Sequence, residues 1–496
     1  MTAREPKQSS LVIARRPKAD EAISTRLLRS LRSLAMTKKD ASRRFLALLL
    51  LVSSLVLTGQ GCRGDAERAA EQPVTLKMWG VFDTDRPYRD IMSAYQAIHP
   101  NVSFEYRQLR LEEYENDLLK AFAEGTGPDI FALHNTWIGE YQNLIAPMPK
   151  SLTIPYVEIR GTIKREKIVT VKQEATISLR QLRNEFLDVV SEDVVRPYQV
   201  TKKDAPENRV FGLPLSVDTL VLFYNKDLLN AASIAEPAAD WNTFHQHIEK
   251  LTKIGPNDVI IQAGAAIGGS RNVERSFDIL SLLMMQNGTV MADEQGRATF
   301  AEEDANRELP GAQATMFYTD FTNPLKKTFT WDAKQPNSFE AFVNGKAAYF
   351  FGYSYHLPLV RARSPKLKFE VAAVPQVKDG RVVHFANYWV ESVSKASKNQ
   401  DWAWDFVQFM TKPDQVKSYL AAARKPPARR ALIESQLEYD DLSVFANQLL
   451  TSKSWYKGKN AAIAEQAFLE LIDAVTEGAP AEDAIDDAQN KVNQSL

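Results

Sequence analysis

The stretch VFGLPLSVDTLVLFYNKDLL, residues 210–229, is the most informative part of this chain for its fold. Its apolar run from Val221 to Phe223 predicts a buried strand, and Gly212 and Pro214 stand in the segment that leads into it. On both sides of this stretch, strand patterns alternate with helix patterns along the chain. Such an alternation predicts an α/β fold.

The chain before this stretch opens with a strand–helix–strand–helix–strand pattern. Apolar and polar residues alternate in VTLKMWGVF (74–82) and in NVSFEYRQL (101–109), which predicts two strands. A helix pattern follows each of them, and GPDIFALHN (127–135) predicts a short buried third strand. This order predicts an α/β lobe in which the carboxyl ends of the strands lie at one edge of the sheet.

The chain after it keeps the same character. DWNTFHQHIEKLTKIG (240–255) predicts a helix with Asp240 as its N-cap, and FDILSLLMMQNG (277–288) predicts an apolar helix. FEAFVNGKAAYFFGYSY (339–355) joins a helix to a buried strand, and the final quarter of the chain is helical.

One segment interrupts the pattern. In VEIRGTIKREKIVTVKQEATI (157–177), apolar residues alternate with charged ones on both sides of a charged run. Two interpretations remain open for an insertion at 151–182: an exposed β-hairpin or a mobile loop.

Length and composition limit the classes of protein. A chain of 496 residues is longer than one hydrophobic core usually supports, so we expect two domains. No linker separates two halves, which favours interleaved domains. Lys and Arg total 61 against 62 Asp and Glu, so no global charge favours nucleic acid as a partner. Cys62 is the single cysteine, which excludes an internal disulfide.

The N-terminal region has the pattern of a secretory signal at 36–61. Basic residues at 38–44 precede an apolar run, residues 45–57, that is shorter than the roughly 20 residues of a membrane-spanning helix. A short membrane anchor is the alternative. Residues 1–35 are interpreted as a disordered extension, or Met36 is the true start. An organellar transit peptide is a further alternative, which the acidic residues of this extension disfavour.

Cys62 follows this apolar segment directly and resembles the lipid-attachment cysteine of bacterial lipoproteins. The match is imperfect, because Gly59 stands where such motifs prefer leucine. We therefore expect lipidation of Cys62, with 62–72 as a tether. The alternative is plain signal cleavage nearby, with Cys62 incidental.

Six segments in order resemble the extracellular solute-binding proteins of the maltose-binding type, which serve ABC sugar importers. They are GTGPDIFALHNTW (125–137), VFGLPLSVDTLVLFYNKDLL (210–229), PAADWNTFHQHIEKL (237–251), FVNGKAAYFFGYSY (342–355), NYWVESVSKASKNQDWAWDFVQFMTKPDQ (387–415) and GAPAEDAIDDAQNKVNQSL (478–496). Asp240 and Tyr349 depart from the threonine and methionine that are usual in the family.

This resemblance implies a two-lobed type II periplasmic-binding-protein fold with a hinge. Lobe one would comprise 73–216 and 376–425, and lobe two 217–372 and 426–496, with crossovers near Ser216, Ala373 and Pro426. It implies a monomeric, extracytoplasmic lipoprotein that captures a carbohydrate, with an oligosaccharide as the expected ligand, and delivers it to ABC permease subunits.

No pattern of catalytic or metal-binding residues stands out in the sequence. Six histidines are present, and His245 and His247 lie two apart on a helix, so they point to different faces. There is no Gly-x-Ser-x-Gly, and GAAIGGS (264–270) lacks the lysine of a phosphate-binding loop. We therefore expect a binding protein with no cofactor and no metal.

The predicted ligand contacts combine aromatic rings with carboxylates and amides, as a sugar requires. Asp218 is the strongest candidate, because the family has a sugar-binding carboxylate at this crossover. Trp79 and Trp389 have an alternative as core aromatics at strand ends. The predicted set is Trp79, Asp83, Asn135, Trp137, Asp218, Tyr353, Tyr355, Asn387, Tyr388, Trp389 and Trp455.

Two other functions remain open. One is capture of a non-sugar solute such as a peptide, a polyamine or a metal complex, although a polyamine site would need more carboxylates than the predicted set holds. The other is adhesion or sensing at the cell surface by a protein of the same fold.

Overall fold

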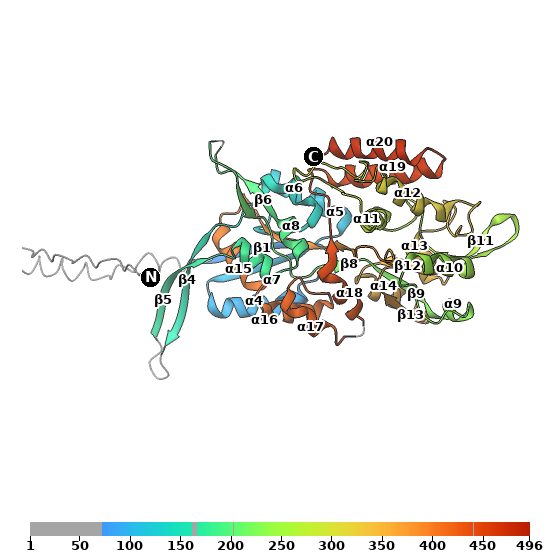
Figure 1. Cartoon of the computed structure of the whole chain (residues 1–496). Coiled ribbons are helices and arrows are strands. Elements are labelled where there is room, and N and C mark those ends of the chain that lie inside the picture. The colour runs from blue at the N-terminus through green and yellow to red at the C-terminus, as the bar shows by residue number, and fades with distance from the viewer. Residues whose placement is uncertain (1–71, 161–165, 202, 440) are drawn as a thin grey trace, which may run out of the picture. The chain divides into compact units, whose positions relative to one another are not determined.

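The computed structural model describes residues 72–160, 166–201, 203–439 and 441–496, which fall within the unit Asp65–Leu496 (Figure 1). The predicted extension, signal segment and Cys62, and nearly all of the tether, lie outside the described residues. Among the helices that the structure describes, none is both long and apolar enough to cross a membrane.

The sheet of lobe one has the strand order β15-β3-β1-β2. It contains β1 (Val74–Gly80), β2 (Val102–Gln108), β3 (Ile130–His134) and β15 (Trp389–Val393). Strands β2 and β3 both run parallel to β1, whereas β15 runs antiparallel to β3, with Trp389 opposite His134. The alternation that predicted β1 is present from Val74 to Met78, because Val74, Leu76 and Met78 are buried and the intervening Thr75 and Lys77 are exposed.

Helices cover this sheet and bury their apolar faces in the core of lobe one (Figure 1). They are α4 (Arg86–Ile98), α5 (Leu111–Ala123), α6 (Ile138–Tyr141), α7 (Leu179–Glu185), α8 (Asp188–Val194), α15 (Gln400–Met410), α16 (Pro413–Ala423) and α17 (Ile433–Gln436).

The sheet of lobe two has the order β10-β11-β12-β9-β13. It contains β9 (Val221–Asn225), β10 (Lys253–Ile254), β11 (Ile260–Ala265), β12 (Ala347–Gly352) and β13 (Phe369–Ala372). The stretch 210–229 thus contains β9, which lies between β12 and β13 and is antiparallel to both. All three residues of its apolar run are buried.

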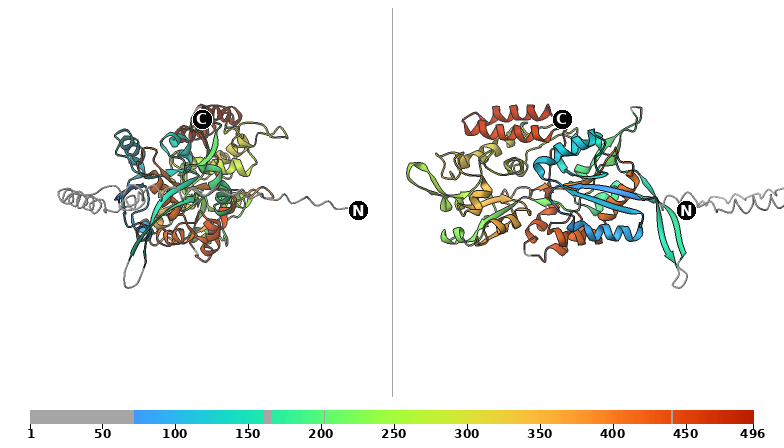
Figure 2. Two further views of the ribbon diagram at one scale, coloured as in Figure 1. Left: turned by 90° about the vertical axis from the view of Figure 1, so that its left-hand side faces the viewer. Right: turned by 180° about the vertical axis from the view of Figure 1, so that it is seen from behind.

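The helices of lobe two include α10, whose N-cap Asp240 accepts a hydrogen bond from the Thr243 amide at 2.9 Å, as predicted. The last two helices, α19 and α20, lie side by side along lobe two (Figure 2). The set is α9 (Lys226–Ala231), α10 (Trp241–Leu251), α11 (Ser276–Gln286), α12 (Pro310–Thr319), α13 (Ser338–Val343), α14 (His356–Arg363), α19 (Ala461–Thr476) and α20 (Ala481–Asn493).

The chain crosses between the lobes along a third sheet, of order β16-β14-β8. Its strands are β8 (Asp218–Thr219), β14 (His384–Asn387) and β16 (Ser452–Lys453). Strand β14 pairs antiparallel with β8, which places Asn387 opposite Asp218, and pairs parallel with β16. Three short paired segments therefore connect the two lobes, which is the arrangement of a hinge.

The crossovers differ in part from those predicted. The first lies where expected, because Val217 packs in the core of lobe one and Leu220 in that of lobe two. The second lies at Phe385, later than Ala373. The third lies after Leu449 rather than at Pro426, because Ala428 still packs in lobe one. Helix α18 (Ser443–Gln448) contacts both lobes.

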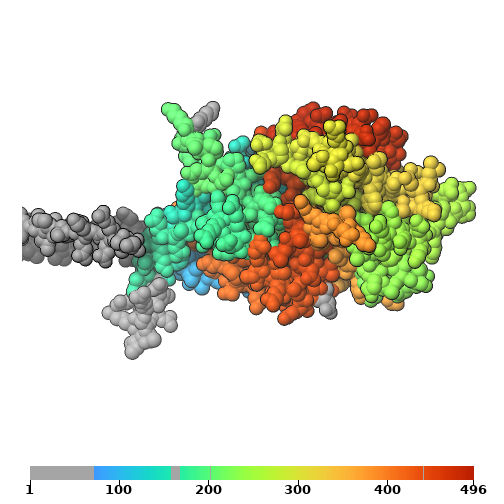
Figure 3. Space-filling model, viewed as in Figure 1, coloured from blue at the N-terminus to red at the C-terminus, as the bar shows by residue number. Residues whose placement is uncertain are grey.

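Two hairpins extend from lobe one. In the predicted insertion, β4 (Ser151–Arg160) pairs antiparallel with β5 (Glu166–Ala175), and the hairpin projects from the surface (Figure 3). A second, shorter hairpin is formed by β6 (Val195–Tyr198) and β7 (Glu207–Val210).

Candidate functional site

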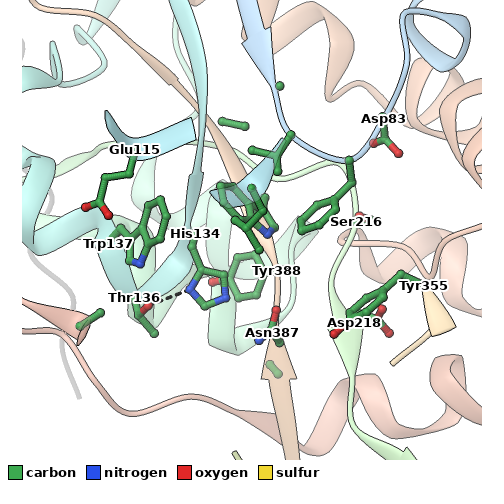
Figure 4. A pocket seen from close by; sticks show the side chains of 18 of the residues that line it. Asp83, Glu115, His134, Thr136, Trp137, Ser216, Asp218, Tyr355, Asn387 and Tyr388 are labelled. Atoms are coloured by element: carbon green, nitrogen blue, oxygen red, sulfur yellow. Dashed lines mark hydrogen bonds between the residues drawn. The ribbon is translucent and has the colours of Figure 1, made fainter. Parts of the chain in front are cut away.

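A cavity of about 780 Å³ lies between the lobes. On the side of lobe one, it opens at the carboxyl ends of the parallel strands, where Gly80 ends β1 and His134 ends β3. Lobe two contributes the start of α11 and Tyr355, which follows β12. The close view shows Trp137 and Glu115 on one side and Asp218 with Tyr355 on the other (Figure 4).

Seven of the predicted residues line this cavity: Asp83, Trp137, Asp218, Tyr355, Asn387, Tyr388 and Trp389. Four others lie outside the lining: Trp79, Asn135, Tyr353 and Trp455. The strand ends predicted from the sequence thus lie at the cavity, but the sequence pattern does not separate side chains that face it from those that turn into the cores.

Aromatic rings from lobe one form one wall. The rings of Trp137 and Trp389 meet edge to face with their centroids 5.4 Å apart, and Phe82 meets Trp389 in the same way at 5.6 Å. Trp137 and Trp389 are both partly exposed, so their rings are available to a ligand. Flat apolar surfaces of this kind pack against the C–H faces of a sugar ring.

Phe82 also reaches across to lobe two. Its ring stacks on that of Tyr355, with the centroids 6.1 Å apart and the planes 8° from parallel. Phe82 and Tyr355 are 47% and 37% exposed, so this contact lies at the edge of the cavity. Because Phe82 belongs to lobe one and Tyr355 to lobe two, their rings can stack only while the two lobes lie this close together.

Asp218 lies in strand β8 and is fixed by hydrogen bonds. One carboxylate oxygen accepts from the backbone amide of Ser354 at 2.9 Å and from its hydroxyl at 2.6 Å, and the other accepts from the Thr219 amide at 2.9 Å. Burial raises the pKa of Asp218 to about 7, although these hydrogen bonds oppose the shift. Asp218 therefore also holds the loop that carries Tyr355.

A buried charged group from α11 forms part of the wall of lobe two. Asp278 is fully buried and accepts hydrogen bonds from the Nε of Arg275 at 2.7 Å and from the Tyr353 hydroxyl at 2.6 Å. A second guanidinium nitrogen of Arg275 bonds the other carboxylate oxygen at 3.0 Å. Asn387 approaches the same carboxylate at 3.5 Å from the crossover strand β14. This network ties the hinge to lobe two.

A second ion pair lies at the lobe-one end. The Nζ of Lys425 is 2.8 Å from both carboxylate oxygens of Asp83, and the Tyr419 hydroxyl donates to the same carboxylate at 2.5 Å. Asp83 thus lines the cavity with its charge already paired.

Glu391 lies beside this ion pair, and among the described residues no basic side chain forms an ion pair with its carboxyl group. It is 6% exposed, and one carboxyl oxygen accepts a hydrogen bond of 3.4 Å from the Tyr88 hydroxyl. Its Oε2 atom has no hydrogen-bond partner among the described residues. Burial, reinforced by the charge of Asp83, raises the pKa of Glu391 to about 8.

The raised pKa of Glu391 predicts a stability that falls with pH. The unfolded chain loses this proton near the ordinary value of 4.5, whereas the folded chain keeps it to about 8. Between these values the free energy of unfolding should fall as pH rises, by on the order of 1 kcal/mol per pH unit. In Glu391→Gln this component disappears, so urea unfolding between pH 5 and 8 should give a flatter profile. Equal slopes in both proteins would contradict the assignment.

The groups that face Glu391 come from five neighbouring segments. The charged ones are Asp83, after β1, and Lys425, after α16; the titratable phenols are Tyr88 of α4, Tyr106 of β2, Tyr114 of α5 and Tyr419 of α16. Burial raises the pKa of each of these phenols above its usual range, so they stay neutral across the window. Glu105 is exposed and lies outside the cavity, so Glu105→Gln is the matched control for the pH profile of Glu391→Gln.

The four predicted residues outside the lining have other partners. Trp79 packs in the core of lobe one, with Arg107 over its ring. Asn135 donates to buried Asp193 at 3.0 Å. Tyr353 is the partner of Asp278 described above. The Trp455 indole packs in the core of lobe two and donates to the Ser281 hydroxyl at 3.0 Å.

Several lining residues were missed from the sequence. Asp278 gave a signal, since it is a lone carboxylate in an otherwise apolar helix pattern. Glu391 gave a similar one inside a buried strand. Arg275 gave none, because its place at the cavity depends on a left-handed backbone conformation with φ of 60° before α11. His134, whose pKa burial lowers to about 4, is a neutral lining residue.

The comparison with protein families decides the identity. The family model described as bacterial extracellular solute-binding protein matches residues 83–417. This chain belongs to that family. The galactooligosaccharide-binding protein of Bacillus subtilis is 19% identical over 405 residues, which are 79% of this chain and 82% of the relative.

Solved structures share the fold of this solute-binding protein. The cyclo/maltodextrin-binding protein complexed with maltotetraose has a TM-score of 0.64 at 16% identity, covering 85% of this chain and 97% of that one. The sugar-binding protein MalE of Xanthomonas citri has a TM-score of 0.63 at 18% identity, with the same coverage of 85% and 97%. The predicted two-lobed type II fold is confirmed, and the family is one of extracytoplasmic binding proteins rather than enzymes.

Proposed function

We propose that this solute-binding protein captures an oligosaccharide in the interlobe cavity and delivers it to the permease of an ABC importer. The observation that carries the proposal is the cavity lining, in which the rings of Trp137 and Trp389 stand beside carboxylates and amides from both lobes. Its volume of about 780 Å³ lies within the roughly 300–1,000 Å³ of ligand-binding pockets.

The chemistry of the lining suits a sugar for two reasons. The indole rings offer flat apolar surfaces for the C–H faces, and polar groups such as Asp218 and Asn387 offer acceptors and donors for the hydroxyls. The names of the relatives agree with this choice, since they mention a galactooligosaccharide and maltotetraose as ligands of those proteins.

Capture would proceed by closure of the lobes about the three paired strands β8, β14 and β16. The ligand contacts both lobes at once, so it stabilises the closed arrangement by its greater affinity for it. The stack of Phe82 on Tyr355 would form on closure and break on opening.

The proposal extends to the cell surface. We infer a monomer that is anchored to the membrane through several acyl chains on Cys62. A single acyl chain would bind the membrane only marginally. Mass spectrometry of the mature protein tests this part by itself, because an unmodified Cys62 would exclude the anchor.

The binding site is tested by calorimetric titration with a panel of neutral oligosaccharides. Trp137→Ala should weaken binding about ten- to a hundredfold, because loss of the stacked ring removes roughly 1.5–3 kcal/mol of apolar burial. Its melting temperature should change little, since Trp137 is partly exposed. Trp402 is partly exposed in the same lobe but outside the cavity, and Trp402→Ala should keep full affinity. Unchanged affinity in folded Trp137→Ala would remove this wall from the site.

A further inference from the structure

The cavity carries an excess of carboxyl groups over basic side chains that a neutral sugar does not require. Among the described residues, its lining holds eight carboxylates against two basic side chains, Arg275 and Lys425. The carboxylates are Asp83, Glu112, Glu115, Glu140, Asp218, Asp278, Glu391 and Glu465. The protein as a whole is nearly neutral, with a formal charge of −1, so the excess is local to the site.

Both basic side chains are already engaged. Arg275 is paired with Asp278, and Lys425 with Asp83. Among the described residues, no ion pair reaches the other six carboxylates, whose remaining partners include neutral hydroxyls such as those of Ser354 and Tyr141. Burial also raises the pKa values of Glu140 and Glu465, as it does for Asp218, so their charged forms lack the stabilisation that a paired cation would give. The cavity therefore presents carboxyl groups whose ionised forms a cationic group of the solute would stabilise.

Glu391 marks where a donor is missing. It is more than nine-tenths buried, it lines the cavity, and its Oε2 atom has no hydrogen-bond partner among the described residues. A buried carboxyl oxygen without a partner is costly, so a ligand group that donates to it gains affinity. Lys425 lies near but is already bonded to both oxygens of Asp83.

The surroundings of Glu391 suit a cation better than a hydroxyl. Three tyrosine rings line the cavity beside it, with Tyr88 at 5.2 Å from Tyr106 and 5.4 Å from Tyr419 between centroids. Aromatic faces attract ammonium groups, and an ammonium group beside buried Glu391 would stabilise its ionised form and pair with it more strongly than in bulk water. A ligand hydroxyl would donate a hydrogen bond to Oε2, but it would not balance the excess of carboxyl groups in the cavity.

We propose that the solute is an amino sugar or an oligosaccharide with a free amine, and that Glu391 with the neighbouring tyrosines binds its ammonium group. This inference rests on the proposed function and names its substrate class. From the sequence, Asp83 and Asp218 were the only carboxylates predicted at the site, and this small number disfavoured a cationic solute such as a polyamine. The six that the fold adds remove the objection to a cationic ligand.

The test is calorimetric titration with matched sets of ligands. Each set contains an aminodeoxy sugar, its N-acetyl form and its neutral parent: glucosamine, N-acetylglucosamine and glucose; the galactose equivalents; and the β-1,4-linked glucosamine disaccharide with its N-acetyl form and cellobiose. Putrescine and spermidine are titrated beside them. We expect the free amine of at least one set to bind ten times more tightly than its partners, or better. This comparison uses the unaltered protein and requires no variant to fold.

Variants then locate the effect. Glu391→Gln keeps the shape of the side chain and should abolish the advantage of the amine, while Glu105→Gln, on the exposed face of β2, should keep it. An advantage that survives Glu391→Gln would overturn the assignment to this residue.

The outcomes separate this inference from the function on which it rests. Neutral or N-acetylated sugars that bind as tightly as the amines in every set would overturn the inference and leave carbohydrate capture intact. Binding of putrescine or spermidine with no carbohydrate bound would overturn carbohydrate capture, and with it the amino-sugar class. Binding of nothing in the panel would also overturn both.

Discussion

Trp455→Ala is expected to lower the free energy of unfolding by about 3–5 kcal/mol. The indole is 7% exposed and packs against Phe277, Phe300 and Phe468 in the core of lobe two. Its removal leaves a cavity between α11 and α19 and also deprives the Ser281 hydroxyl of its donor at 3.0 Å. Chemical denaturation of both proteins measures the loss.

Trp455→Phe is the matched control, since it keeps an aromatic ring and loses mainly the indole N–H. It should cost far less than alanine, about 1 kcal/mol for the hydrogen bond plus a small packing defect. This pair of variants also decides between two roles for the residue. A Trp455→Ala protein with normal stability and reduced ligand affinity would restore the ligand contact predicted from the sequence and contradict the core placement.

Asp278→Ala is expected to cost a similar amount, about 3–5 kcal/mol, because it leaves a guanidinium without its partner. Asp278 is fully buried and accepts hydrogen bonds from Arg275, Tyr353 and, at 3.5 Å, Asn387. The side chain of Arg275 is 29% exposed, so water solvates part of the guanidinium once the carboxylate is gone, and the loss should lie at the lower end of this range. Thermal and chemical unfolding should both show the change.

A surface ion pair provides the control for this effect. Arg361 and Asp441 lie 2.9 Å apart with side chains 50% and 32% exposed. Exposed pairs contribute about 0–1 kcal/mol, so Arg361→Ala should change stability little. Equal losses in the two variants would mean that the Arg275–Asp278 pair is no better shielded from water than one at the surface.

The fold was accessible from the sequence because its signals are local. Alternation in β1, the apolar run of β9 and the N-cap Asp240 of α10 each reflect short-range rules of geometry. The third crossover was misplaced for the same reason. Two consecutive prolines after Lys425 resemble a boundary in sequence, but the packing of Ala428 into lobe one is a long-range contact.

The site was accessible only in part. The rule that ligands bind at the carboxyl ends of strands brought Trp137 to the cavity, and the crossovers implied by the family resemblance brought Asp218 and Asn387 there. The same rule does not say which way a side chain turns. Trp79 and Trp389 both lie at strand ends of one sheet, yet they turn in different directions. The ring of Trp389 lines the cavity, whereas that of Trp79 does not.

The charge of the cavity was the least accessible property. Glu391 is separated from Asp83 by 308 positions in sequence and from Glu465 by 74. Their common environment exists only once both lobes have formed and met. A composition of 61 basic and 62 acidic residues hides this local imbalance entirely.

The central claim is that both lobes bind the solute and close around it, and small-angle scattering tests this most directly. A carbohydrate shown to bind by calorimetry is added at saturation, and the radius of gyration is compared with that of the free protein. Closure about β8, β14 and β16 predicts a smaller radius in the complex. An unchanged radius at calorimetric saturation would show a rigid cavity and contradict the account.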